Sequence, residues 1–227
     1  MKRTLFTLTA LLTIFCSCGN KTSQNQSVHN DDSEQAYYIR RDTTIYGFCA
    51  EGSAMNTLQI ITDAGDTITV STVKAREKNK VFGGYAIGDE MAILTNADTT
   101  EALIVINKSM LNGDWVMPNP LDGSSETGIR ILRGGAAESI DQSSIVYKSW
   151  RIFNGMLQII ATREDGIDME EYMLYDILKL TPDSLVFRTA NGDENDKETY
   201  EYGHPSGDTY GDLGITLDDG TNDEFDM

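Results

Sequence analysis

Apolar and polar residues alternate along most of this chain in short runs separated by turn residues. Residues 67–71 alternate with the period of two that is typical of a half-buried β-strand, and residues 58–60 do the same. Residues 102–106 are continuously apolar over one strand length, as expected for a strand buried on both faces. Residues 73–80 fit one short helix or a long loop. Residues 43–107 therefore predict a small β-domain, either a barrel or a sandwich.

A second region of the chain, residues 111–203, carries a stronger strand signal. Two apolar-rich runs, residues 145–153 and 156–161, flank Asn154-Gly155, a pair that favours the positive φ angles of a two-residue hairpin turn. Four further strands are predicted at residues 128–133, 136–141, 171–180 and 185–189. Successive short strands with tight turns predict an antiparallel barrel. The fold class is thus all-β, with a small N-terminal β-barrel or sandwich followed by a second β-barrel.

The first eighteen residues have the order of a secretory signal. Lys2-Arg3 is a basic start, residues 5–15 are a short apolar run, and Ser17-Cys18 follows at once. This order predicts a signal peptide at residues 1–17 that ends in a lipobox-like site. We expect Cys18 to become the lipidated N-terminus and to hold the protein on a membrane through its acyl chains.

Two alternatives to lipidation remain open from the residues alone. A membrane-spanning helix needs about 20 apolar residues, and this run is about half as long. An ordinary cleaved signal without lipid is the more serious alternative, because Phe15 and Cys16 are imperfect residues before Ser17. Cys16 is the poorer acceptor of the two cysteines, since the large Phe15 precedes it.

Composition and charge limit the partners of the protein. Residues 18–42 are mostly polar and predict a flexible tether, and residues 204–227 predict an acidic, disordered tail. The chain has 36 acidic and 18 basic residues, a net charge of −18. This excess of acid argues against nucleic acid as a partner, because each phosphate contact needs a lysine or arginine. We expect the protein in the bacterial cell envelope, on the outer membrane and facing the periplasm.

Several segments of the second region resemble the bacterial lipocalin-like lipoprotein family. Residues 113–116 resemble the G-x-W opening of lipocalin-type barrels. Residues 128–140 (G-I-R-I-L-R-G-G-A-A-E-S-I) and the Tyr-x-x-Trp of residues 147–150 are similar to a longer motif of the family, and residues 180–187 to its closing strand pair. The resemblance covers about ninety residues. It implies one antiparallel lipocalin-like barrel on an exported lipoprotein, in a family generally without an assigned function.

Four aromatic residues of this region are candidates for a ligand cavity or for the barrel core. Trp115 has a large apolar body and one N–H donor, which suits a residue that plugs a barrel end. Tyr147 and Phe153 differ by six and share a strand face, whereas Trp150 faces the other side unless a bulge intervenes. A small barrel often fills its interior with its own side chains, so both roles remain open.

Catalytic and metal-binding chemistry has little support in the sequence. Only two histidines exist, His29 in the tether and His204 in the tail, which argues against a catalytic triad or a histidine zinc site. Cys49 has apolar neighbours and is expected to be a buried small residue. We therefore expect no enzyme activity, no metal and no cofactor.

Two functions follow as hypotheses. The first is a membrane-anchored, non-catalytic binding or accessory module whose barrel holds a small apolar ligand. The second is a structural or protein-interaction module of the cell envelope, with an envelope protein as its partner and no small ligand. An open cavity in the second barrel would favour the first, and a filled interior would favour the second.

Overall fold

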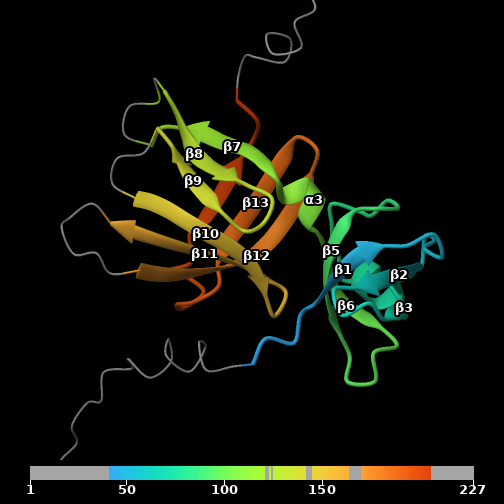
Figure 1. The fold of residues 1–227 in the computed structure, drawn as a ribbon. Helices are drawn as coiled ribbons and strands as arrows, with labels where there is room; N and C mark the ends of the chain where they lie inside the picture. Colours follow the sequence, from blue (N-terminus) through green and yellow to red (C-terminus); the bar gives the residue numbers. More distant parts are fainter. Residues whose placement is uncertain (1–40, 121–122, 124, 142–144, 164–169, 206–227) are drawn as a thin grey trace, which may run out of the picture. The chain divides into compact units, whose positions relative to one another are not determined.

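The computed structural model describes residues 41–120, 123, 125–141, 145–163 and 170–205. These residues are mostly β-structure with two short helices, and the strands form three sheets (Figure 1). The expectation of a β-rich fold is confirmed. We call residues 41–107 the N-terminal region and residues 108–205 the C-terminal region. The predicted signal peptide, Cys18, most of the tether and residues 206–227 of the tail lie outside the described residues.

The N-terminal region is a six-stranded sheet in the order β3-β2-β1-β5-β6-β4. Its elements are β1 (Ile45–Cys49), β2 (Thr57–Thr62), β3 (Thr67–Ser71), α2 (Val73–Glu77), β4 (Val81–Phe82), β5 (Glu90–Thr95) and β6 (Ala102–Asn107). All neighbouring strands are antiparallel except β4 and β6, which run parallel. The helix α2 occupies the segment for which the sequence left helix or loop open, and it buries Ala75 against the sheet.

Aliphatic side chains fill the interior of the N-terminal region. The alternation along β2 and β3 places Leu58, Ile60 and Val70 on the buried side, and each is at most 1% exposed. The residues of this core are Cys49, Leu58, Ile60, Val70, Ala75, Met91, Ile93, Ala102 and Val105. Cys49 is buried as expected, with its Sγ 3.2 Å from the hydroxyl oxygen of Ser53.

The N-terminal sheet does not close into the barrel, or pair into the sandwich, that the sequence predicted. The outer edge of β3 meets the start of β6 at one parallel bridge, Ser71 with Glu101, where the Ser71 amide donates to the Thr100 carbonyl at 2.9 Å. Further along, β4 pairs with β6 at Val105 and Ile106. Because β4 occupies that edge of β6, β3 cannot extend its ladder along it.

The C-terminal region begins with a short helix and continues as eight antiparallel strands. Its elements are α3 (Lys108–Leu111), β7 (Gly113–Pro118), β8 (Glu126–Ile131), β9 (Ala137–Ile140), β10 (Ile145–Phe153), β11 (Met156–Arg163), β12 (Glu170–Thr181), β13 (Ser184–Thr189) and β14 (Thr199–Tyr202). Strands β7-β8-β9 form one sheet and β10 to β14 the other, each strand pairing with its neighbour in sequence. The helix α3, capped by the Asn107 side chain at the Met110 amide, is an element the sequence pattern did not indicate.

Single bridges join the two sheets of the C-terminal region in place of a continuous barrel ladder. Val116 and Gly203 exchange two backbone hydrogen bonds of 2.8 and 2.9 Å, and the Trp150 amide donates to the Gly135 carbonyl at 2.8 Å beside the bridge of Ala136 with Ser149. The eight strands thus follow one another in ring order, but neither sheet closes, which differs from the predicted barrel. One of these bridges involves Ala136, the residue before β9, and the other involves Gly203, the residue after the short β14.

The predicted hairpin is confirmed as β10 and β11. Asn154 and Gly155 form its turn with φ angles of 49° and 78°, and Phe153 pairs with Met156 across it. The register shifts between Tyr147 and Ser149, where one extra residue of β10 forms a β-bulge. The residues that follow on β10 therefore change faces relative to a regular strand.

The two regions share one hydrophobic core. Phe82, Ala92 and Ile106 of the N-terminal region pack in the same cluster as Ile152 and Leu180 of the C-terminal region. Backbone and side-chain hydrogen bonds add to this contact. The Gly83 amide donates to the Leu180 carbonyl at 3.1 Å, and the hydroxyl of Tyr46 donates to the Ile152 carbonyl. The N-terminal region therefore packs on the end of β10, β11 and β12 that is formed by residues 152–157 and 177–180.

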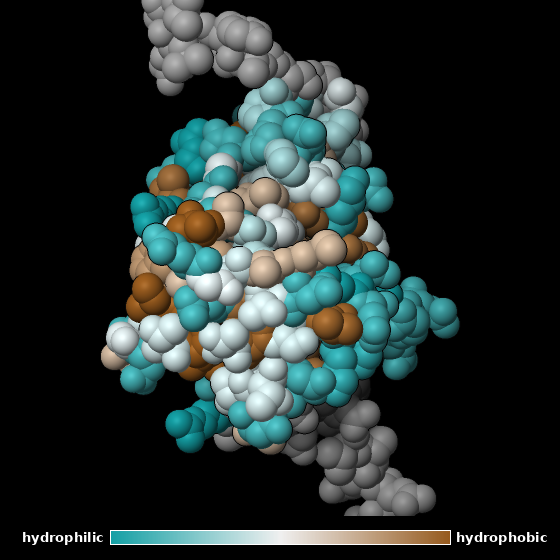
Figure 2. All heavy atoms as spheres, turned by 90° about the vertical axis from the view of Figure 1, so that its right-hand side faces the viewer, coloured by the Kyte–Doolittle hydropathy of each residue, from teal (hydrophilic) through white to brown (hydrophobic). Residues whose placement is uncertain are grey.

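Surface apolar side chains are scattered. Figure 2, seen from the side on which the N-terminal region is drawn, shows brown residues among teal and white ones. The large apolar residues that are most exposed are Phe48, Met55, Ile61, Val73, Ile87, Tyr172 and Leu178. Phe48 and Ile61 are cross-strand partners on β1 and β2, so they form an exposed apolar pair. Among the described residues, no helix has the length and apolar character to cross a membrane.

Candidate ligand-binding cavity

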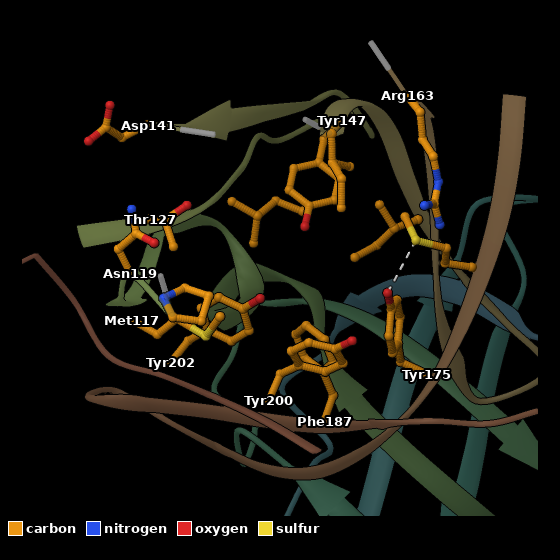
Figure 3. A pocket seen from close by; sticks show the side chains of 15 residues that line it. Met117, Asn119, Thr127, Asp141, Tyr147, Arg163, Tyr175, Phe187, Tyr200 and Tyr202 are labelled. Atoms are coloured by element: carbon orange, nitrogen blue, oxygen red, sulfur yellow. Dashed lines mark hydrogen bonds between the residues drawn. The ribbon is translucent and has the colours of Figure 1, made fainter. Parts of the chain in front are cut away.

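A cavity of about 420 Å³ lies inside the C-terminal region, between side chains of both of its sheets (Figure 3). The pleat of these strands sends alternate residues inward, so each wall strand contributes side chains two positions apart. The residues that line the cavity are Met117, Asn119, Pro120, Thr127, Ile129, Asp141, Ile145, Tyr147, Ile159, Arg163, Met173, Tyr175, Phe187, Tyr200 and Tyr202. Most are aromatic or aliphatic, with a few polar groups among them.

Aromatic rings form much of the cavity wall. Phe187 of β13 lies at the centre of a ring cluster, 4.7 Å from Tyr175, 5.7 Å from Tyr200 and 5.2 Å from Tyr202 between ring centroids. Tyr147 reaches the same space from β10, opposite these rings (Figure 3). The rings are rigid and pack on one another, so they stay along the wall and do not fill the cavity.

The hydroxyls of these tyrosines differ in their hydrogen-bond partners. Tyr200 donates to Glu198 Oε2 at 2.5 Å. Tyr175 donates to the Sδ of Met173 at 3.3 Å, and a thioether sulfur is a weak acceptor (Figure 3). Tyr202 is 5% exposed, and its hydroxyl has no partner among the described residues. The hydroxyls of Tyr175 and Tyr202 thus lack a strong acceptor among the described residues.

Burial keeps these phenols in their protonated form. It raises the pKa of Tyr200 to about 12, with the hydrogen bond to Glu198 as a second cause. Burial also raises the pKa of Tyr175 and that of Tyr202 well above the ordinary value, and repulsion from a charged Tyr147 adds to both. All three hydroxyls are therefore neutral donors at neutral pH.

Two charged residues stand among the described lining residues. Arg163, at the end of β11, donates from Nε to Glu171 Oε1 at 2.8 Å, so a carboxylate on β12 already balances its charge. Asp141 follows β9 with a positive φ of 48° and is exposed. The interior walls between them carry tyrosines, methionines and isoleucines, with no fixed charge among the described residues.

Below the cavity, the C-terminal region is filled. Trp115 is 1% exposed, its Nε1 donates to the Leu111 carbonyl at 2.8 Å, and its ring stacks on His204 with centroids 4.4 Å apart. His204 also has the carbonyl oxygens of Asp114 and Pro182 at 2.9 and 2.8 Å from its two ring nitrogens. His204, which the sequence assigned to the tail, is therefore part of the folded region.

The four aromatic candidates from the sequence occupy different places. Tyr147 lines the cavity. Trp115 and Trp150 lie in the shared core, and Trp150 Nε1 donates to the Leu132 carbonyl at 2.8 Å. The bulge after Tyr147 places Trp150 inward. The alternation of residues had predicted that Trp150 faces outward unless such a bulge intervenes. Phe153 is buried outside the cavity, with the Arg151 guanidinium carbon 4.9 Å from its ring centroid.

Sequence reasoning missed most of the cavity wall. Tyr200 and Tyr202 stand two apart on β14 and share a face of that strand. Tyr175 and Phe187 come from β12 and β13 and meet across the ladder, since Tyr175 pairs with Thr189 and Ile177 with Phe187. Nothing local in the sequence indicates that these rings converge with Tyr147.

The described residues hold no cluster of three or more histidine, cysteine or acidic side chains placed to bind a metal. No constellation of nucleophile, base and orienting group stands out around the cavity either. Its polar groups are phenols, one amide, one threonine and two charged residues. Polar groups of these kinds occur among the apolar walls of many ligand pockets.

Two comparisons of this chain with known proteins found a similarity. Residues 107–211 match the family model described as lipocalin-like. A solved structure of a lipocalin-like protein from Bacteroides thetaiotaomicron is similar, with 27% sequence identity over 41% of this chain and 95% of that chain, and a TM-score of 0.35. None of the curated proteins compared with the chain matches it. The chain therefore contains a lipocalin-like domain at residues 107–211, as the sequence motifs implied.

Proposed function

We propose that this protein is a non-catalytic binding module that holds a small, mainly apolar ligand in the cavity of its lipocalin-like domain. The observation that carries the proposal is the cavity itself, about 420 Å³ with aromatic and aliphatic walls. Ligand sites typically measure about 300–1,000 Å³ and combine apolar walls with a few placed polar groups. A small barrel-like fold that only served as a structural element would gain stability by filling this space.

The filled lower half of the same region supports the proposal. Trp115, Trp150 and Ile152 are each at most 4% exposed and pack into the core at the end next to the N-terminal region. The cavity is therefore confined to one end of the strands, where Tyr147 and Arg163 stand. A ligand would enter from that end and rest on the packed aromatic floor.

A cavity-filling substitution tests the proposal. Met173 lines the cavity from β12, and the next residue, Tyr172, is exposed on the opposite face. We expect purified protein to retain or bind apolar ligands such as 1-hexadecanol, as seen by native mass spectrometry. Met173→Trp should abolish this binding, and Tyr172→Trp should leave it unchanged. The experiment uses protein with Cys18→Ala, so that no acyl chain competes.

Two results would contradict the proposal. One is a protein that binds no apolar ligand at all, and the other is equal binding by the Met173→Trp and Tyr172→Trp variants. The circular dichroism of both variants serves as the control for folding.

We further propose that the protein is exported and anchored to the bacterial outer membrane through a lipid on Cys18. The support is the order of basic start, apolar run and cysteine in residues 1–18. Metabolic labelling with palmitate tests this, and Cys18→Ala should remove the label. Labelling that persists in the variant would disprove acylation at this cysteine.

A protein-interaction role in the cell envelope is the second candidate function. Two observations favour it. The two regions share one core, so they present their surfaces together. Phe48 and Ile61 form an exposed apolar pair on that surface. Crosslinking in cells should recover an envelope protein, and the double variant Phe48→Ser, Ile61→Ser should lose it. Recovery of the same protein by the double variant would argue against this surface.

A further inference from the structure

We propose that the ligand of this cavity is an uncharged molecule with an aromatic or alicyclic body and a hydrogen-bond acceptor such as a ketone or quinone oxygen, not a fatty-acid anion. This inference rests on the proposed binding function and specifies the chemistry of the ligand. Three properties of the described cavity residues carry it: unfilled donors, the lack of an available countercharge, and flat aromatic walls.

The first property is the set of hydrogen-bond donors on the wall. No described residue accepts a hydrogen bond from the Tyr202 hydroxyl, and the Tyr175 hydroxyl has only the sulfur of Met173, a weak acceptor. Both phenols can therefore donate to a bound ligand without giving up a strong hydrogen bond within the protein. An acceptor oxygen on the ligand would satisfy these phenols, and Figure 3 shows both hydroxyls facing the cavity.

The second property is the absence of an available positive charge among the described lining residues. A carboxylate buried in the cavity would lose its hydration and would need a cation in return. Arg163 is the one cation there, and Glu171 already balances it at 2.8 Å. Asp141 at the same end and the net charge of −18 repel anions further. An uncharged ligand meets none of these penalties.

The third property is the shape of the walls. Phe187 with Tyr175, Tyr200 and Tyr202 presents a cluster of rings whose centroids lie 4.7–5.9 Å from one another. Rigid rings of this kind favour stacking or edge contacts with a flat ligand body. Met117 and Met173 add flexible, polarizable side chains that adapt to the outline of such a body.

A matched pair of fluorescent naphthalene dyes tests the charge preference. The neutral ketone 6-propionyl-2-(dimethylamino)naphthalene and the anionic 6-(dimethylamino)-2-naphthoate share the same ring system and differ in the acceptor group. We expect the ketone to bind at least ten times more tightly than the naphthoate at pH 7.5. The bound ketone should also emit as a hydrogen-bonded carbonyl does, at longer wavelength than in an aprotic solvent.

Tyrosine-to-phenylalanine variants test the donors. Tyr202→Phe removes one hydroxyl and keeps the ring, so it should weaken binding of the ketone about five- to tenfold and shift its emission to shorter wavelength. The affinity for the naphthoate should change less in the same variant. Tyr172→Phe, on the outer face of β12, is the matched control and should change neither value.

The charge preference, the role of the hydroxyls and the binding function itself are contradicted by different results. Tighter binding of the naphthoate, or equal binding of both dyes, overturns the charge preference while the binding function stands. Ketone binding and emission that are unchanged in both Tyr202→Phe and Tyr175→Phe overturn the role of the hydroxyls. Failure of both dyes and of 1-hexadecanol to bind contradicts the proposed function itself.

Discussion

The two regions of this protein have the same alternating strand pattern, but the interior of one is filled and that of the other contains a cavity. In the N-terminal region, side chains such as Leu58, Ile60 and Ile93 pack into a core in which each is at most 1% exposed. In the C-terminal region, the interior is filled at one end and open at the other. Strand number accounts for part of the difference, because about eight strands are needed before an interior has room for one small ligand.

The side chains account for the rest of the difference. The N-terminal interior is built from small and aliphatic residues, which pack closely against one another. The open end of the C-terminal region is built from rings such as Tyr175, Phe187 and Tyr202, which stack along the wall. Alternation thus decides which residues point inward, and their shapes decide whether the interior is solid or hollow.

The largest expected effect is the different cost of truncating a side chain in the two interiors. Leu58→Ala removes a fully buried side chain from the filled core, which should cost about 3 kcal/mol of unfolding free energy because the packed neighbours cannot collapse. Met173→Ala enlarges a space that already exists and should cost about 1 kcal/mol. Urea unfolding followed by circular dichroism measures both. An equal loss of unfolding free energy in the two variants would contradict the difference between a filled and an open interior.

The next effect concerns the filled floor of the C-terminal region. His204→Ala removes the stacking on Trp115 and the contacts with the Asp114 and Pro182 carbonyls, and should cost about 1 to 2 kcal/mol. The emission of Trp115 should shift to longer wavelength as water reaches the ring. His204→Phe keeps the stacking alone and should recover part of the loss. Unchanged stability in His204→Ala would mean that this ring does not secure the floor.

A smaller effect concerns acid. Two hydrogen bonds from Arg130, at 2.7 and 2.8 Å, lower the pKa of Asp114 below its ordinary value. A lowered folded-state pKa stabilises the protein above the unfolded-state value of about 3.9, and this contribution is lost as the pH falls through the folded-state pKa. Both side chains are partly exposed, so Asp114→Asn should cost only about 0.5 kcal/mol at pH 7. Unfolding experiments at pH 7 and pH 3 should show the difference shrinking at low pH.

The smallest effect at neutral pH concerns the ionisation of the cavity phenols. With a pKa of about 12 for Tyr200, the contribution of its neutral hydroxyl to stability is complete below pH 10 and is lost as the pH rises toward 12. In an alkaline titration followed by absorbance at 295 nm, some tyrosines should therefore ionise at higher pH than the others. Tyr200→Phe should remove one of these tyrosines. Ligand affinity should stay constant between pH 6 and 9. A fall within that range would mean that a charged group takes part in binding.

Much of the strand order could be predicted from the sequence because its signals are local. Asn154-Gly155 specifies a hairpin turn from two residues, and the alternation of residues 67–71 specifies β3. The G-x-W segment at residues 113–116 pointed to the lipocalin-like domain, which the family match at residues 107–211 bears out. Such features need no knowledge of distant contacts.

The failures of the sequence analysis concern contacts between distant strands. A barrel or sandwich was predicted for the N-terminal region, yet β4 occupies the edge of β6 there. A barrel was predicted for the C-terminal region, yet only single bridges join its two sheets. The bulge after Tyr147 turns Trp150 inward, which regular alternation could not foresee. Of the four aromatic candidates for cavity or core, Tyr147 lines the cavity, and Trp115 and Trp150 lie in the core.

By itself, the sequence determined the β-rich class of this protein, its hairpins, its lipocalin-like segment and its strongly acidic charge. These follow from side-chain periodicity, turn conformation and composition, which are properties of neighbouring residues. Only the tertiary structure decided that Tyr147, Tyr175, Tyr200 and Tyr202 surround one space and that Trp115 and His204 close the region below it. Strand pairing sets such convergence through the register of residues far apart in the chain, and the fit between facing side chains determines whether space remains between them.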